Sequence, residues 1–173
     1  MIFSAPVQHW LTGFHGYKAR TSLDMPQLSS DPATLRLILP TLTGCASRCP
    51  GNLMLAIKLM REQSARLRLV LMPVRPDTDL TPVAQKLTRE TNIKVDRLND
   101  AFLDSRTRLA KYEQIQTSPE HPPQHAGYLY LYHPSSQILL TYTAPSLAAI
   151  LSDIDTLNRG ANDGDKHIQL VSN

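Results

Sequence analysis

The feature of this sequence that most constrains its fold is a pair of cysteines between an apolar run and a helix-like run. Residues 34–41 are predicted to form a buried strand, because four apolar side chains on both faces suit a strand covered by helices. Residues 50–65 are predicted to form a helix, since apolar side chains recur there at i, i+3, i+4 and i+7. Residues 67–74 read as the next strand. This order predicts a βαβ unit with Cys45 and Cys49 at its first turn.

Weaker patterns predict the remaining elements. Residues 10–24 read as a short hairpin whose turn is framed by glycines. The other expected elements are helices at 81–91, 100–113 and 146–157, a proline-rich loop at 117–124, and strands at 126–132 and 138–143. The order predicts a thioredoxin-like α/β fold, in which helices flank a central mixed sheet that carries an N-terminal β-hairpin. We expect a single domain over residues 1–158 and a polar C-terminal tail over 159–173.

Composition bounds the class of protein. The chain has 173 residues, 42% of them hydrophobic and 19% charged, which suits one globular domain with its own core. Its net charge of +3 comes from acidic and basic residues that are interleaved, and the basic cluster from Lys58 to Arg68 is broken by Glu62. We therefore expect no nucleic-acid partner. No apolar run approaches the roughly 20 residues of a membrane span. The N-terminus lacks a signal-peptide pattern, so we expect a cytoplasmic protein or a sequence without its leader.

Cys45 and Cys49 are the only cysteines, and they stand four residues apart where a helix is predicted to begin. Free backbone N–H groups at a helix start favour negative charge, which lowers a thiol pKa and raises the thiolate fraction. The thiolate is the form that binds soft metals and attacks disulfides. Two buried structural thiols are the simpler alternative. The pair therefore predicts a metal site or a redox site.

Three motifs, taken in order, resemble those of a known family. They are Cys45-x-x-x-Cys49-Pro50 after the first strand, Val74-Arg-Pro-Asp-Thr-Asp79 after the second, and His125 followed by Tyr130, Leu131 and Pro134. Over roughly residues 10–157 the chain resembles the Sco/SenC copper proteins of cytochrome oxidase assembly. One motif alone would be weak, but the three together in the expected elements are specific.

The resemblance implies a copper site formed by Cys45, Cys49 and His125. Thiolates select Cu(I), and imidazole binds both Cu(I) and Cu(II), so the donor set suits that metal. It implies a Sco-type metallochaperone, a binding protein without turnover, that assists copper-centre assembly in cytochrome c oxidase. The implied partner is cytochrome c oxidase subunit II or another copper chaperone. The implied location is the periplasm, or the membrane facing it through an N-terminal anchor that this sequence does not display.

Other functions remain open on the same residues. Cys45 and Cys49 could act as a catalytic redox pair in a thiol–disulfide reductase, with Cys45 as the attacking and Cys49 as the resolving thiol. A redox or copper sensor is a further alternative, and a zinc site of two cysteines and one histidine ranks below copper. His121 competes with His125 as the imidazole ligand. His125 could also be a loop histidine bonded to backbone.

Arg48 distinguishes this chain from the family, whose spacer between the cysteines usually carries an acidic residue. A guanidinium beside the thiols should lower the pKa of the more reactive one. We expect Arg48→Glu to raise that pKa and to slow alkylation by iodoacetamide near neutral pH severalfold. Arg66→Glu serves as the control, because Arg66 stands far along the sequence from the cysteine motif. Labelling of Arg48→Glu at the wild-type rate or faster would contradict the expectation.

Overall fold

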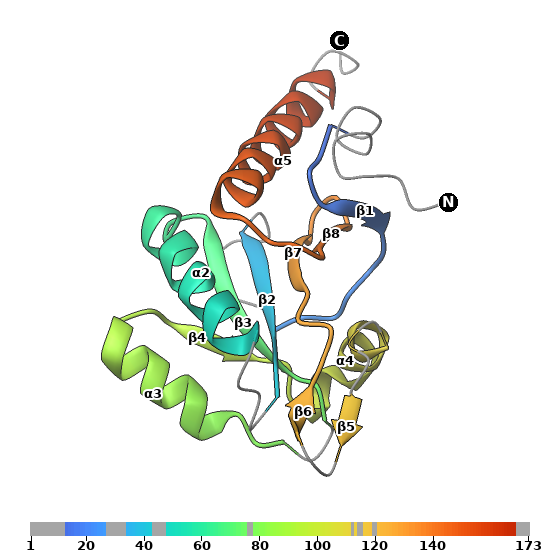
Figure 1. Ribbon diagram of the computed structural model, residues 1–173. Coiled ribbons are helices and arrows are strands. Elements are labelled where there is room, and N and C mark those ends of the chain that lie inside the picture. Colours follow the sequence, from blue (N-terminus) through green and yellow to red (C-terminus); the bar gives the residue numbers. More distant parts are fainter. Residues whose placement is uncertain are drawn as a thin grey trace.

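The computed structural model describes residues 13–26, 34–42, 48–75, 78–111, 113, 116–118 and 121–168. Its strands are β1 (Tyr17–Arg20), β2 (Leu35–Thr41), β3 (Leu67–Pro73), β4 (Val95–Arg97), β5 (Gln116–Ser118), β6 (His121–Gln124), β7 (Leu129–His133) and β8 (Ile138–Tyr142). Six of these strands form one mixed sheet in the order β1-β8-β7-β2-β3-β4, and β5 pairs with β6 separately (Figure 1).

The helices cover both faces of the sheet. They are α2 (Arg48–Glu62), α3 (Thr81–Thr91), α4 (Leu103–Ala110) and α5 (Leu147–Ile168), and a 3₁₀ turn η1 (Asp100–Phe102) precedes α4. Apolar side chains of α2, α3 and α5 join one core cluster with the sheet, whereas Leu109 of α4 joins the cluster on the other face. Figure 1 shows α2 and α3 on the opposite side of the sheet from α4. Because both faces are covered, β2, β3 and β7 are buried along nearly their whole length.

The predicted βαβ unit is confirmed. β2 and β3 pair in parallel with Leu37 opposite Leu69, and α2 connects them. β4 extends the parallel part of the sheet, while β7 joins β2 in the antiparallel sense with Ile38 opposite Tyr130. The predicted fold class is confirmed as an α/β fold with a mixed sheet between helices. The division into a domain at 1–158 and a tail at 159–173 stays a prediction.

The expected N-terminal hairpin is wrong for the residues that the structure describes. Their one strand, β1, pairs with β8 instead, with Tyr17 opposite Thr141. Gly16 permits this approach, since a Cβ at that position would meet Leu140 and the Tyr142 ring at 3.0 Å. The hairpin prediction required β1 to pair with a neighbouring segment of the chain. In the structure, β1 instead pairs with β8, which lies near the other end of the chain.

Two other expectations differ from the structure. The proline-rich segment at 117–124 contains most of the β5–β6 pair and is not only a loop. The last helix, expected to end at 157, continues to Ile168, into the segment expected to be a loose tail. No helix in the described ranges is long and apolar enough to cross a bilayer.

A buried carboxylate joins α5 to the start of β1 and the end of β8. Asp153, which is 0% exposed, accepts hydrogen bonds from the backbone N–H groups of His15 and Gly16 at 2.9 Å and from the Tyr142 hydroxyl at 2.8 Å. Burial, reinforced by the nearby Asp153 charge, raises the pKa of Tyr142 well above its ordinary value. The phenol therefore stays protonated and donates to the carboxylate.

We expect Asp153→Ala to lower the free energy of unfolding by about 3 kcal/mol, because two buried donors and one partly buried donor lose a charged acceptor. Asp155→Ala, at an exposed position on the same helix, should change it by less than about 0.5 kcal/mol. Urea denaturation followed by circular dichroism measures both values. Equal stability of the two variants would contradict the role given to Asp153.

Candidate metal site

The sheet topology brings two of the predicted motifs to one edge. The chain leaves β2 at Thr41 shortly before Cys45, and it enters β7 at Leu129 shortly after His125. Because β2 and β7 are antiparallel neighbours, the end of one lies beside the start of the other. The first turn of α2 and the loop before β7 therefore share this edge, as the sequence predicts for a joint site.

The structure describes the three predicted ligands to different extents. Cys45 lies outside the described residues, and Cys49 is described only as part of the backbone of α2. His125 is described fully, and its side chain is 1% exposed. The backbone of the competing candidate, His121, lies in β6, and its side chain is outside the described part.

Asn52 joins the first turn of α2 to the loop that carries His125. Its side-chain Nδ2 donates a hydrogen bond to the backbone carbonyl of Gly127 at 2.8 Å. Asn52 stands one helical turn after Cys49, and Gly127 stands two residues after His125. This bond holds the start of the cysteine helix against the histidine loop. Gly127 has a φ of 68°, which glycine adopts without the strain that a side chain would bring.

Glu113 is the centre of a buried hydrogen-bond network around His125. Its side chain is 0% exposed, and its Oε2 lies 2.5 Å from His125 Nδ1. The same carboxylate accepts the backbone N–H groups of Gly127 at 2.9 Å and Tyr128 at 3.1 Å, and the hydroxyl of Tyr130 at 2.9 Å. Four donors on two oxygens satisfy the charged group, which is the condition for burying it at low cost.

The network determines which nitrogen of His125 can act as a ligand. An ionised carboxylate only accepts hydrogen bonds, so Nδ1 carries the proton in its contact with Glu113. The Gly127 N–H lies 3.2 Å from Nδ1 but 2.9 Å from the carboxylate, which is consistent with Glu113 as its acceptor. When the ring is neutral, its lone pair then lies on Nε2, the atom that a metal would use.

Among the residues whose side chains the structure describes, no group of three or more His, Cys, Asp and Glu side chains could hold a metal ion. The described half of the candidate site is therefore the His125 imidazole with its carboxylate support. This arrangement fits a metal-binding histidine, because histidines that bind metals regularly donate the N–H of their other ring nitrogen to a carboxylate.

Sequence reasoning missed both supporting residues. Glu113 follows Lys111 and Tyr112 near the end of a predicted helix, where an isolated glutamate reads as an exposed residue. Asn52 reads as an ordinary residue of the first helical turn. The only signal was the position of Asn52 beside the cysteine motif, since neither burial nor hydrogen bonding can be read from the sequence at these places.

Comparison with known proteins gives structural matches only. Neither a protein-family model nor a curated protein sequence matches the chain. The chain is similar to a SCO1/SenC family lipoprotein from Bacillus anthracis, with a TM-score of 0.55, 20% identity, and coverage of 73% of this chain and 83% of that one. It is also similar to Bradyrhizobium japonicum ScoI with copper bound, with a TM-score of 0.53, 14% identity, and coverage of 72% and 85%.

A third match is a thioredoxin-like protein from Neisseria meningitidis, with a TM-score of 0.50, 17% identity, and coverage of 78% of this chain and 81% of that one. Identities this low show the fold. The predicted resemblance to Sco/SenC proteins is thus confirmed as a structural match across most of the chain, on a thioredoxin-like fold.

We expect Glu113→Gln to reduce the free energy of unfolding by about 2 kcal/mol. The glutamine amide keeps one acceptor oxygen but has an NH2 donor in place of the other, so some of the four donors lose their acceptor. In wild type, nitrogen-15 NMR should show the His125 proton on Nδ1 with a downfield, slowly exchanging signal. The variant should lose that signal. Glu90→Gln, at an exposed site on α3, is the matched control. An unchanged Nδ1 proton signal in Glu113→Gln would contradict the network.

Proposed function

We propose that this chain is a copper-binding metallochaperone of the Sco type, with Cys45, Cys49 and His125 as its ligands. Copper is its cargo, and the protein delivers it during assembly of the copper centre in cytochrome c oxidase. The chemistry of the donor set supports this, because two thiolates retain Cu(I) and the imidazole adds a ligand that also accepts Cu(II). The three sequence motifs supply the family resemblance.

The observation that carries the proposal is the hydrogen bond from Asn52 to Gly127. Because it holds the start of α2, which contains Cys49, against the loop of His125, residues separated by about half of the chain meet at one edge of the sheet. A simple dithiol reductase has no need of a supported histidine there. The bond supports a site that uses the cysteines and the histidine together.

Glu113 has a defined part in this function. Its contact with Nδ1 orients the ring and favours the tautomer with its lone pair on Nε2. Because His125 and Glu113 are both buried, water competes weakly for these hydrogen bonds. The histidine is thus held ready before any metal arrives, which reduces the ordering cost of binding.

The partner and the location follow from the same resemblance. We propose that the chain acts on cytochrome c oxidase subunit II or on another copper chaperone. We place it in the periplasm, or anchored to the membrane on that side. The Bacillus anthracis protein of similar structure is a lipoprotein, which supports a membrane-associated setting.

The test is a copper titration of the reduced protein against a Cu(I) chelator, together with a separate Cu(II) titration. Wild type should bind one Cu(I) per chain, and Cys45→Ser or Cys49→Ser should abolish binding. His125→Ala should weaken Cu(II) binding more than Cu(I) binding, because the thiolates retain the softer ion. His121→Ala should bind like wild type.

Two outcomes would overturn parts of the proposal. Wild-type binding by either serine variant would remove the cysteines from the site, and loss of binding in His121→Ala with retention in His125→Ala would exchange the histidines.

A cellular test distinguishes copper delivery from the competing reductase function. Normal oxidase activity at limiting copper in a His125→Ala strain, beside failure of a Cys45→Ser strain, would make the chain a thiol–disulfide reductase.

A further inference from the structure

A cavity lies where β3 and β4 end. It has a volume of about 380 Å³, and we call it the arginine cavity. Its polar lining consists of Thr78, Asp79, Arg97, Asn99, Asp100 and Arg106. The ends of β3 and β4 are carboxyl ends of parallel strands, which is where open α/β sheets bind their ligands. The volume lies in the range of small-molecule sites.

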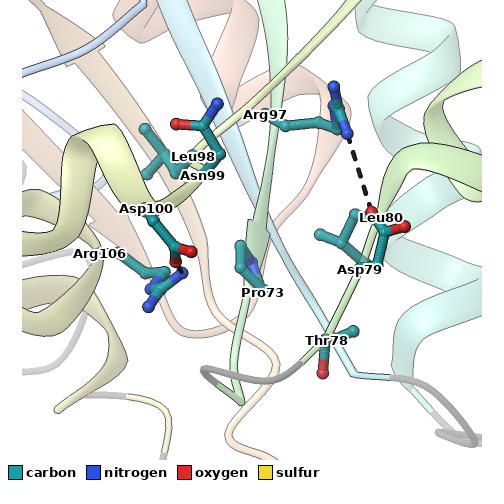
Figure 2. Close-up of a pocket in the computed structure, with 9 residues that line it drawn as sticks. All are labelled: Pro73, Thr78, Asp79, Leu80, Arg97, Leu98, Asn99, Asp100 and Arg106. Carbon is teal, nitrogen blue, oxygen red and sulfur yellow. Dashed lines mark hydrogen bonds and ion pairs between the residues drawn. The ribbon is translucent and has the colours of Figure 1, made fainter.

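The two arginines stand on opposite sides of the arginine cavity. Figure 2 shows Arg106 with Asp100 on one side of Pro73, and Arg97 with Asp79 on the other. The pairs differ in burial. The side chain of Arg106 is 7% exposed, whereas that of Arg97 is 37% exposed. Arg106 is thus the more desolvated of the two charges, and the one that gains more from a charged acceptor.

Arg106 has donors that its contacts in the described part of the chain do not use. Its Nη1 donates to Asp100 Oδ1 at 2.9 Å, and the structure gives no second acceptor for this guanidinium within that part. A guanidinium carries five N–H groups in a planar fork that matches a carboxylate. Asp100 itself is 90% exposed, so it can turn into solvent at little cost. A ligand carboxylate could then take its place with both oxygens.

The opposite side of the arginine cavity holds a charge pair that leaves no net positive charge to attract a second anion. Asp79 Oδ1 accepts the backbone N–H of Thr81 at 2.8 Å and its hydroxyl at 2.6 Å. These two hydrogen bonds, more than the charge of Arg97, hold the pKa of Asp79 below its ordinary value. Asp79 is therefore a fixed anion near neutral pH, and it offsets Arg97, which also donates to the Thr81 hydroxyl.

The lining of the arginine cavity also includes three apolar residues. Pro73, Leu80 and Leu98 contribute to it, and Leu80 and Leu98 are buried. A ligand anchored at Arg106 would thus place its body against apolar side chains and its far end toward Asp79. We propose that the arginine cavity binds a small monocarboxylic acid with an apolar body, anchored by the guanidinium of Arg106. This site does not depend on copper.

Benzoate is the probe, and its binding to the metal-free protein is followed by NMR. Wild type should bind benzoate saturably, with chemical-shift changes centred on the Arg106 side chain and its neighbours. Benzamide, which lacks the charge, and terephthalate, which brings a second carboxylate toward Asp79, should each bind about tenfold more weakly. Asp79→Asn should remove the discrimination against terephthalate.

Variants on α4 complete the test. Arg106→Gln should weaken benzoate binding about tenfold, and Arg106→Lys should also weaken it, because an ammonium lacks the planar fork. Arg108→Gln, at an exposed position on the same helix, should bind like wild type. Absence of saturable benzoate binding by wild type, or shift changes centred away from Arg106, would overturn the proposal. If Arg106→Gln does not fold, the wild-type ligand series and Asp79→Asn still decide the question.

Discussion

The candidate site depends on one buried carboxylate. Glu113 gathers the His125 ring, two backbone N–H groups and a tyrosine hydroxyl onto its two oxygens. Without an acceptor at this position, the loop before β7 would bury several unpaired donors, at a cost of about 1–3 kcal/mol for each. Glu113 therefore accepts the hydrogen bonds of the loop and also orients the His125 ring. The same carboxylate stabilises this region and positions the proposed metal-binding side chain.

The sheet and Asn52 add the second constraint. Parallel pairing of β2 with β3 and antiparallel pairing of β2 with β7 bring both motifs to one edge, and the Asn52 hydrogen bond joins them there. A carboxylate-supported histidine in a loop that is bonded to the start of the helix containing Cys49 is more than a dithiol exchange site requires. We propose that this arrangement serves a site for a thiophilic metal, because the imidazole must be held in place while the metal changes its set of ligands.

The sequence predicted the parts of the fold that strong apolar patterns encode. The strand at 34–41 was recoverable because it is apolar on both faces, and the helix at 50–65 because its apolar residues recur at i, i+3, i+4 and i+7. β4 was not, because its three residues include a single apolar side chain, Val95. The partner of β1 was hidden because pairing between segments over 100 residues apart leaves no local signal. His125 was predicted from its motif, whereas Glu113 was missed because burial of a lone glutamate is a tertiary property.

The central claim is that copper is held by two sulfur atoms and the His125 nitrogen. X-ray absorption at the copper edge of the Cu(I)-loaded protein tests it most directly, because sulfur and nitrogen scatter differently. The account predicts two sulfur neighbours and one nitrogen neighbour in wild type, and loss of the nitrogen contribution in His125→Ala. A wild-type spectrum with sulfur neighbours alone, or one that His125→Ala leaves unchanged, would contradict it.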